Sequence, residues 1–433
     1  MLAGNLEFDF VRTNIPKTPP LHAALKSPLS EQLLAFREFG KSTRRVATKT
    51  TNSSGQGFEV PTFVNEFWTS KQRAASRLHE ISYRACFKPQ LPRFFIQRLT
   101  QPGDLVYDPF MGRGTTVLEA ALLGRAACGC DINPLSSFLT RPRLKPPTLE
   151  QITERLSEID FTDFAEQPEE LLVFYHAETL QEICALRKYL LRRQAEAALD
   201  FIDDWIWMVA LNRLTGHSKG FFSVYTLPPN QAVSVKSQLK INETRGQTPP
   251  RRRVRQIIAH KSRQLLSDCD SEVRQTLASI IPGRFLTRSS VSTPEIPSGT
   301  VSLVVTSPPF LDVVDYAGDN WLRCWFVGID PREVKLTVPK KVEEWQKVMT
   351  AVFDELFRVL RPGGHVAFEV GEVRGGKVKL EEAVIPCGAE AGLRPLLILI
   401  NDQKFTKTAN CWGVDNNLKG TNTNRIVLFQ KAQ

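Results

Sequence analysis

A short apolar run that stops at a pair of prolines constrains the fold of this chain most strongly. Val301 to Val305 is rich in β-branched residues and leads into Thr306-Ser307-Pro308-Pro309-Phe310. The run predicts a fully buried strand, and because proline lacks an N–H donor the strand must end at the two prolines. Proline also fixes φ and restricts the residue before it, so Ser307 and Phe310 are expected to be held stiffly at the carboxyl end of this strand. Ligands bind at that end of the strands in an open α/β sheet.

The tetrapeptide itself suggests a ligand. Ser307 offers a hydroxyl, Pro308 and Pro309 offer carbonyl oxygens, and Phe310 offers an aromatic face, whereas none of the four has an ionisable side chain. This set suits a planar ring that carries an amino group. The alternative is a proline-rich exit from a strand into a loop, with no binding role.

A second strand is followed by a glycine-containing loop. Leu105-Val106-Tyr107 reads as a short strand and Val117 to Leu123 as a helix, with Asp108-Pro109-Phe110-Met111-Gly112-Arg113-Gly114-Thr115-Thr116 between them. Glycines let a ligand approach the backbone, and the start of a helix presents free N–H groups. The next predicted strand, Ala126 to Gly129, ends near Asp131, and a carboxylate at this distance can accept hydrogen bonds from ribose hydroxyls. The sequence therefore predicts a nucleoside-binding half-site.

The loop excludes two common nucleotide motifs. A dinucleotide fingerprint needs a third glycine where this chain has Val117, and a P-loop needs a lysine after Gly114. Asp108 would repel a phosphate but could bind a cationic or amino group. A ligand with a ribose and a positive centre therefore fits better than one with a pyrophosphate.

The charge is unevenly distributed along the 433 residues. The formal net charge is +10, the segment from Glu150 to Asp204 holds 14 acidic and 5 basic residues, and the segment from Lys236 to Arg263 holds 9 basic and 1 acidic. This separation predicts a directed positive face and favours a polyanionic partner. The Arg251-Arg252-Arg253-Val254-Arg255 cluster is expected to neutralise phosphates, and the loop from Leu214 to Gln231, with His217 and Lys219, is expected to face bases. A solvated basic turn is the alternative for both.

Alternating strands and helices predict the fold class. Helices are expected from Leu91 and over Val342 to Leu360 and Leu380 to Gly392, and strands over Val366 to Val370, Leu396 to Ile400 and Ile426 to Phe429. No helix pattern separates the last two strands, which are therefore expected to pair antiparallel. The pattern predicts an α/β protein with a doubly wound, mostly parallel sheet. Four parts are expected: an irregular segment over 1–60, a cofactor-binding half over 61–148, an inserted helical and basic target-recognition region over 149–284, and a catalytic half over 285–433.

Cysteine usage and the amino terminus bear on the compartment. The eight cysteines are scattered, with no C-x-x-C pair and no histidine at zinc spacing, so reduced thiols and no metal site are expected. No apolar signal region is visible at the amino terminus, and the apolar stretch from Ala197 to Leu214 carries four charged residues. A cytoplasmic protein without membrane contact is expected.

With both motifs in view, the chain resembles the S-adenosylmethionine-dependent amino methyltransferases of DNA. The glycine loop with Asp131 and the Ser-Pro-Pro-Phe tetrapeptide carry the resemblance, supported by Leu360-Arg361-Pro362-Gly363-Gly364 and Thr423-Asn424-Arg425-Ile426-Val427-Leu428-Phe429. It covers about 78–136 and 300–430. It implies a seven-stranded sheet, S-adenosylmethionine as the cofactor and double-stranded DNA as the substrate. It also implies a prokaryotic or phage origin. A separate restriction endonuclease is a possible cognate partner.

The resemblance also implies residue roles. In this family a serine before Pro-Pro is most associated with the N4 amine of cytosine, whereas Asp or Asn is usual for adenine N6. Ser307, Pro308, Pro309 and Phe310 would then bind a flipped cytosine. The cofactor would contact Asp108, Pro109, Phe110, Gly112, Gly114, Thr115 and Asp131, with Lys88 and Pro89 closing its pocket.

Three other interpretations stay open at this point. The enzyme could methylate adenine N6 or RNA, or the chain could be a non-catalytic DNA-binding protein that retains the fold. A fourth, in which Cys387 after Pro386 attacks carbon 5 of cytosine, is disfavoured because Cys387 falls within a predicted helix and lacks an accompanying Glu-Asn-Val segment.

Overall fold

The computed structural model describes most of the chain. The described residues are 28–52, 54–68, 75–83, 86–163, 166–226, 232–280, 283–309, 316–334, 339, 341–373, 378–402 and 423–433. Phe310, the last residue of the predicted amine-binding tetrapeptide, and part of the predicted base-facing loop, residues 227–231, lie outside them.

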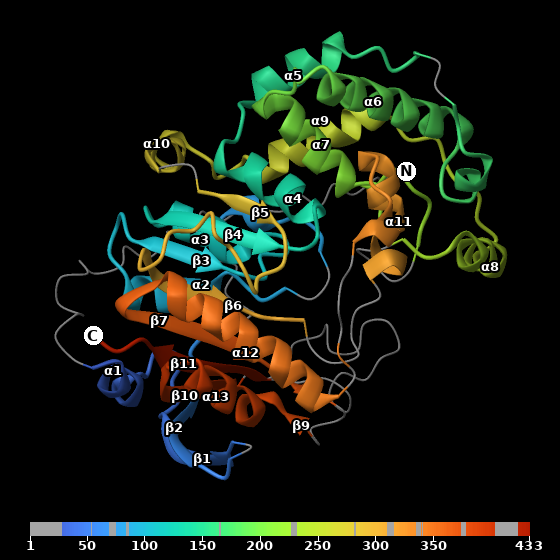
Figure 1. The fold of residues 1–433 in the computed structure, drawn as a ribbon. Coiled ribbons are helices and arrows are strands. Elements are labelled where there is room, and N and C mark those ends of the chain that lie inside the picture. Colours follow the sequence, from blue (N-terminus) through green and yellow to red (C-terminus); the bar gives the residue numbers. More distant parts are fainter. Residues whose placement is uncertain are drawn as a thin grey trace.

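One large mixed sheet organises the molecule (Figure 1). Its strands run in the order β1-β2-β10-β11-β7-β6-β3-β4-β5. They are β1 (Arg44–Thr51), β2 (Gly57–Asn65), β3 (Leu105–Asp108), β4 (Ala126–Asp131), β5 (Phe285–Thr287), β6 (Val301–Thr306), β7 (Leu360–Val370), β10 (Arg394–Asp402) and β11 (Thr423–Gln430). The short strands β8 (Glu372–Val373) and β9 (Val378–Lys379) pair separately.

The predicted doubly wound, mostly parallel sheet is confirmed, and its strand count is corrected. From β5 to β10 the sheet has seven strands, of which β11 runs antiparallel to both neighbours, as expected from the missing helix before it. Two further strands, β1 and β2, extend the sheet beyond β10 to nine strands.

The two extra strands also correct the prediction of an irregular segment over 1–60. β1 and β2 form an antiparallel hairpin, and β2 pairs parallel to β10. Most of β1 is exposed at the edge of the sheet, so its polar residues gave no apolar alternation from which a strand could be predicted.

Thirteen α-helices are found among the described residues. They are α1 (Leu29–Ala35), α2 (Gln90–Leu99), α3 (Thr115–Leu122), α4 (Leu135–Leu144), α5 (Leu149–Glu158), α6 (Ala177–Ala195), α7 (Phe201–Leu211), α8 (Val235–Arg245), α9 (Val254–Leu265), α10 (Ser271–Ser279), α11 (Tyr316–Val327), α12 (Val342–Val359) and α13 (Leu380–Glu390). Short 3₁₀ turns are η2 (Arg77–His79), η3 (Glu169–Val173) and η4 (Pro331–Glu333). None of the helices among the described residues is long and apolar enough to cross a membrane.

Alternate residues of the central strands bury opposite faces of the sheet. Tyr107 and Val304 pack in one core with α12 and α13, whereas Val106 and Leu303 pack in a second core with α2 and α3. This two-residue period is what a strand covered on both sides requires. The run from Val301 to Thr306 is buried at every position, as the apolar sequence predicted.

A third core lies outside the sheet, in the helical region above it in Figure 1. It includes residues of α4 to α7, α9 and α10, with Trp205 and Trp207 of α7 fully buried. α11 follows the catalytic strand β6, yet it also packs here: Arg187 of α6 donates to the Trp325 carbonyl oxygen at 2.9 Å. Segments from before and after β6 therefore meet in this region.

Candidate active site

The two predicted motifs leave the sheet side by side. β3 pairs with β6 in parallel, through Val106 with Leu303 and Tyr107 with Val304, so the loops that follow both strands start at the same edge. The Thr306 hydroxyl donates to Asp108 Oδ1 at 2.6 Å. The glycine loop after Asp108 and the Ser-Pro-Pro segment after Thr306 are thus tied together at their first residues.

Asp108 is a buried link rather than an open carboxylate. It is 1% exposed, and its Oδ1 also accepts from the Phe110 N–H at 3.1 Å. Burial raises its pKa to about 7, against the opposing effect of hydrogen bonds from Thr306, Phe110 and Thr116. Through these hydrogen bonds Asp108 fixes the start of the glycine loop. Its direct contact with the cofactor remains a prediction.

The glycine loop lies against the end of β4. The Met111 N–H donates to the Cys130 carbonyl oxygen at 2.9 Å, and the Gly112 N–H donates to Asp131 Oδ2 at 2.7 Å. Gly112 has φ +52°, and a Cβ there would meet Tyr83 at 3.6 Å, an ordinary contact. A ligand could therefore approach the backbone at Gly112, as predicted for this loop.

Glycine is required at position 114 for a different physical reason. Its φ is +73°, and a Cβ there would come within 2.3 Å of Thr140 Oγ1 on α4. Glycine is needed because the loop packs against a helix, not because this position is open. Pro109 and Thr115 are buried as well, so they shape the loop more than they line an open surface.

Asp131 ends β4 beside this loop. Its two carboxylate oxygens accept from Gly112 and from the Asn133 N–H, the latter at 2.8 Å. Burial raises its pKa, although hydrogen bonds from Asn133, Gly112 and Ser136 oppose the shift. The residue keeps intermediate exposure. An oriented, partly accessible carboxylate at this position fits the predicted ribose contact.

Tyr83 is a residue of this site that sequence reasoning missed. Asn133 Nδ2 donates to its hydroxyl at 2.9 Å, and its ring is the nearest group to Gly112. Burial, first, and the nearby Asp131 carboxylate raise the pKa of the hydroxyl well above its ordinary value. Its only signal in sequence was an aromatic residue shortly before the first strand.

Arg143 of α4 supports the loop from behind. It is fully buried and donates to the carbonyl oxygens of Leu139, Leu78 and Arg113, the last of which belongs to the glycine loop. No described carboxylate forms an ion pair with it, and burial lowers its pKa to about 9. The loop is therefore clamped by a cation whose bonds all go to backbone carbonyls.

Lys88 and Pro89 stand at the start of α2. Pro89 is buried and occupies the position just before the helix, whereas Lys88 is exposed. Because α2 ends just before the turn into β3, its first residues lie toward the carboxyl edge of the sheet. Their predicted role in closing the cofactor pocket remains a prediction.

The Ser-Pro-Pro segment is held by α12 and β7. Trp345 Nε1 of α12 donates to the Pro309 carbonyl oxygen at 3.2 Å, and Pro308 is buried. The Ser307 hydroxyl forms a hydrogen bond with the Glu369 carboxylate of β7. These contacts hold Ser307 and Pro309 at the carboxyl end of β6, and the predicted stiffness of the segment stays a prediction.

Glu369 is the second functional candidate that the sequence analysis missed. It is 8% exposed, and its Oε1 accepts from Asn424 Nδ2 of β11 at 2.6 Å. Burial raises its pKa, while hydrogen bonds from Asn424 and Ser307 act in the opposite direction. The Glu369 carboxylate accepts a hydrogen bond from the Ser307 hydroxyl. The lone pairs of the serine oxygen are then available to accept a hydrogen bond from another group.

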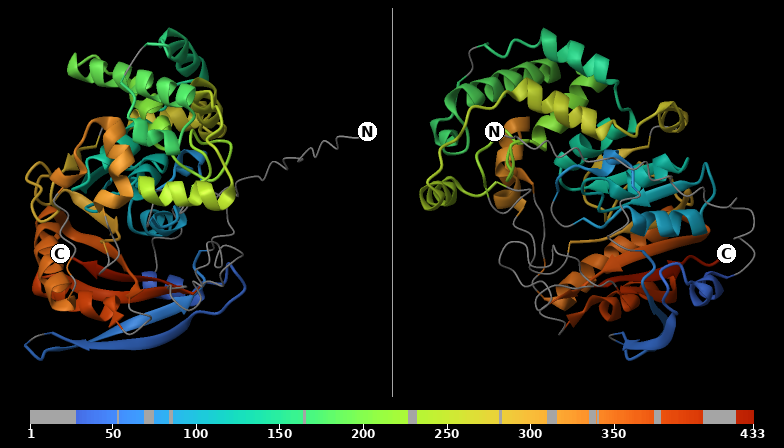
Figure 2. Two further views of the ribbon diagram at one scale, coloured as in Figure 1. Left: turned by 90° about the vertical axis from the view of Figure 1, so that its right-hand side faces the viewer. Right: turned by 180° about the vertical axis from the view of Figure 1, so that it is seen from behind.

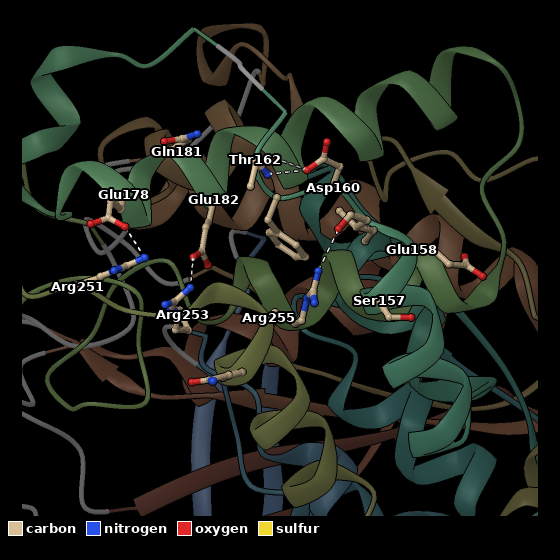
Figure 3. A pocket seen from close by; sticks show the side chains of 13 residues that line it. Ser157, Glu158, Asp160, Thr162, Glu178, Gln181, Glu182, Arg251, Arg253 and Arg255 are labelled. Atoms are coloured by element: carbon tan, nitrogen blue, oxygen red, sulfur yellow. Dashed lines mark hydrogen bonds and ion pairs between the residues drawn. The ribbon is translucent and has the colours of Figure 1, made fainter.

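The arginine cluster lies in a pocket of the helical region of about 630 Å³ (Figure 3). Arg251 forms an ion pair with Glu178, and Arg253 lies 3.9 Å from Glu182. Arg255 donates to the Ile159 carbonyl oxygen at 3.2 Å. The acidic and basic stretches of the sequence thus pair with each other here.

This pairing weakens the expectation of a directed positive face at the cluster. Arg252 is held through its backbone, whose N–H donates to Thr179 Oγ1 at 2.7 Å. Glu182 also accepts from the Val254 N–H at 2.7 Å and so caps α9. The glutamates reduce the charge that the arginines could offer to phosphates, and their role in DNA binding stays a prediction.

The predicted base-facing loop is described up to Thr226. His217 and Lys219 are exposed at its tip, and the loop is closed by a hydrogen bond from the Thr226 N–H to the Gly216 carbonyl oxygen at 3.2 Å. Both side chains are accessible to a partner, and their contact with DNA stays a prediction.

Cys387, the alternative nucleophile, lies in α13 as expected. It is 1% exposed and donates to the Ala383 carbonyl oxygen at 3.4 Å. Burial raises its pKa to about 11, so at neutral pH it is a thiol rather than a thiolate. The geometry gives it no route to a substrate base.

Known proteins resemble parts of this chain. Residues 29–136 match the model of a DNA methylase family named for N6 and N4 methyltransferases. The Type II methyltransferase M.MjaII of Methanocaldococcus jannaschii is 31% identical over 88 residues, which cover 20% of this chain and 17% of that protein. M.BsoBI of Geobacillus stearothermophilus, also a Type II methyltransferase, is 22% identical over 300 residues, or 64% of this chain and 58% of that protein.

Among solved structures, the rRNA methyltransferase AviRa from Streptomyces viridochromogenes is 12% identical with a TM-score of 0.33, covering 82% of this chain and 90% of that one. The chain spans less than two thirds of the length of the two Type II relatives. The family match includes β3, the glycine loop, β4 and Asp131. Residues 29–136 are thus similar to the DNA amino methyltransferases, and the relatives that match parts of the chain are Type II methyltransferases.

Proposed function

We propose that this protein transfers a methyl group from S-adenosylmethionine to the N4 amine of a cytosine flipped out of duplex DNA. The observation that carries the proposal is the junction of two loops at β3 and β6, one with a carboxylate suited to ribose and one with Ser307 bonded to Glu369. Cytosine is favoured over adenine because Ser307 stands where Asp or Asn is usual in the members of the resembled family that modify adenine N6.

The cofactor would lie against the glycine loop. Asp131 would accept a ribose hydroxyl, Gly112 would let the ligand reach the backbone, and Tyr83 would cover one side. S-adenosylmethionine supplies an electrophilic methyl group on a positive sulfonium, which suits a loop that carries no lysine for phosphate. Asp108 keeps the two loops in register.

The amine would be held by the Ser-Pro-Pro segment. The Ser307 hydroxyl donates to Glu369, so its lone pairs can accept an N–H of the amine. That bond and one to the Pro308 carbonyl oxygen would direct the nitrogen lone pair at the methyl carbon. Phe310 would stack on the ring. Direct transfer needs mainly alignment, which the rigid loop supplies without a covalent nucleophile.

The amine must lose one proton as its bond to carbon forms. Glu369 is the carboxylate bonded to Ser307, and its raised pKa makes it a better proton acceptor than an ordinary glutamate. The proton would leave the nitrogen for Ser307 Oγ as the Ser307 proton passes to Glu369. Adenine N6 transfer would use the same groups and is the second candidate.

The test is mass spectrometry of nucleosides from unmethylated DNA incubated with enzyme and labelled S-adenosylmethionine. N4-methylcytosine, abolished or strongly reduced by Ser307→Ala, is the expected product. N6-methyladenine would replace the cytosine assignment. Full activity of Ser307→Ala would contradict the assigned role of the serine, and DNA binding by the wild type without any methylation would favour a binding protein.

A further inference from the structure

Helix α8 stands on the surface of the helical region with almost none of its residues buried. Gln238 is its one buried residue, and the amide of that side chain donates to the Tyr225 carbonyl oxygen at 3.1 Å. Asn242 Nδ2 donates to the Val173 carbonyl oxygen at 2.8 Å. α8 is therefore docked by side-chain amides, and its opposite face is left to solvent.

The outer face of α8 is basic. At about 100° per residue, Lys236 and Lys240 point away from Gln238 and lie one turn apart. Both are exposed, and within the described part of the chain neither forms an ion pair with a carboxylate. Glu243 is the only acidic residue of the helix, and Leu239, 46% exposed, is its one large exposed apolar residue.

This face contrasts with the arginine cluster. Two cations of the cluster, Arg251 and Arg253, face Glu178 and Glu182, whereas Lys236 and Lys240 of α8 have no carboxylate partner among the described residues. An isolated exposed leucine among lysines does not suit a protein interface, which needs an apolar centre. The charge of α8 complements a polyanion.

α8 lies on the same side of the molecule as the candidate active site (Figure 1). α8 projects on the side of the molecule toward which β4 runs, and in the left view of Figure 2 it lies in front of the sheet (Figures 1 and 2). The loop that carries His217 and Lys219 is joined to it, because Tyr225 of that loop accepts from Gln238 and stacks against Arg245 at 3.9 Å. Loop and helix form one continuous surface.

We propose that α8 enters the major groove of duplex DNA, with Lys236 and Lys240 directed at base edges and flanking phosphates. The proposal rests on the proposed function, since it assigns the part of the protein that selects the DNA. Its 11 residues span about 16 Å, and the major groove, about 12 Å wide, admits a single α-helix. The residues near the start of such a helix contact the bases.

The experiment compares Lys236→Ala and Lys240→Ala with Arg263→Ala. Arg263 is exposed near the end of α9, which leads to α10 on the side of the molecule opposite α8 (Figure 1). Duplex affinity is measured over a range of salt concentrations, methylated positions on a plasmid are mapped by sequencing, and cofactor affinity reports on folding. A lost base contact weakens binding to a preferred site about 5- to 150-fold, and a lost phosphate contact lowers the salt slope by about 1.

The expected result is weaker DNA binding and a relaxed set of methylated positions for the two lysine variants, with unchanged cofactor affinity, and wild-type behaviour for Arg263→Ala. Wild-type affinity and positions in both lysine variants would overturn the inference. A lowered salt slope with an unchanged set of positions would also overturn it, because α8 would then track phosphates without reading bases.

A fourth variant tests the rival surface. If Arg251→Ala with Arg253→Ala lost DNA affinity while the α8 variants kept it, the arginine pocket would be the DNA surface and the inference would be wrong. If the wild type bound DNA through α8 but transferred no methyl group, the proposed function would fail while the role of α8 stood.

Discussion

Replacing Glu369 with glutamine tests how Ser307 is prepared for the amine. In the wild type the Glu369 carboxylate can only accept, so the Ser307 hydroxyl must donate to it. Its other partner, Asn424 Nδ2, also donates. A glutamine side chain has one oxygen that accepts and one NH₂ group that donates. If its oxygen accepts from Asn424 Nδ2, its NH₂ group must face Ser307. The serine would then lose a lone pair that the amine needs.

The magnitude follows from the kind of bond that is lost. A hydrogen bond to a charged group contributes about 1.5–3 kcal/mol, and each 1.36 kcal/mol changes a rate tenfold. Glu369→Gln is therefore expected to lower kcat about 10- to 150-fold. Because Glu369 lies beside Ser307 and not beside Asp131, KM for S-adenosylmethionine should stay unchanged.

Single-turnover methylation of duplex DNA measures this rate, with Ser307→Ala and the double variant assayed beside it. If Glu369 acts through the serine, the double variant should be no slower than Ser307→Ala alone. Additive losses would show that Glu369 acts separately. A glutamine variant with wild-type kcat would refute the reasoning.

The same pair predicts a pH dependence. Burial raises the pKa of Glu369, and the protonated acid can no longer take up the proton that Ser307 would pass to it. The rate should therefore fall as pH decreases through this raised pKa. Glu369→Gln should lose that acidic limb, and a variant that keeps it would assign the limb to another group.

Three further changes test the scaffold. Gly114→Ala should destabilise the protein by at least about 1 kcal/mol in denaturant unfolding, since φ is +73° and the new Cβ would overlap Thr140. Glu119→Gln should cost about 3 kcal/mol, because the buried Glu119 carboxylate accepts from Arg93 at 2.5 Å and from His79 at 2.9 Å. Burial acts to raise the pKa of Glu119, but hydrogen bonds and charges from His79 and Arg93 outweigh it, so the pKa lies below its ordinary value. The wild type should therefore lose this stabilisation as pH falls below about 4.5. The variant, which has no carboxylate at this position, should not. Cys387→Ser should methylate at the wild-type rate, and a loss beyond tenfold would reopen the cysteine mechanism.

Local patterns allowed the catalytic strands and their loops to be predicted. β6 was visible because its residues are apolar without a break and two prolines stop it, and β3 with its loop because Gly112 and Gly114 precede a clear helix. These signals lie within about ten residues of each other, where periodicity and turn chemistry decide the structure. The antiparallel last strand followed from the missing helix in the same way.

Contacts across strands could not be predicted in this way. Glu369 lies 62 residues after Ser307, and only the pairing of β6 with β7 brings them together. α4 was missed because it begins just after Asp131 and contains Pro142, which hides the helical pattern. Its side chains nevertheless set the glycine loop, through Thr140 and Arg143.

Charge was misleading for a related reason. The acidic stretch before Asp204 and the basic stretch after Lys236 looked like separate surfaces, yet α6 and the start of α9 place Glu178 against Arg251. Acidic and basic residues that are separated along the sequence can therefore form ion pairs with each other in the folded protein. The cations that keep their charge, on α8, were less conspicuous because they are spaced along a helix.

The topology places both candidate binding loops at one edge of the sheet. From β3 the chain turns to β4 on one side and later returns to β6 on the other, so the connections diverge between β3 and β6, where ligands bind in such sheets. The helical region is inserted in the connection from β4 to β5, and α11, which follows β6, packs against it. The segments that follow β4 and β6 thus both enter the helical region from the edge of the sheet where their strands end. If α8 holds DNA as proposed, the duplex would lie on the side of the molecule toward which both loops project (Figure 1).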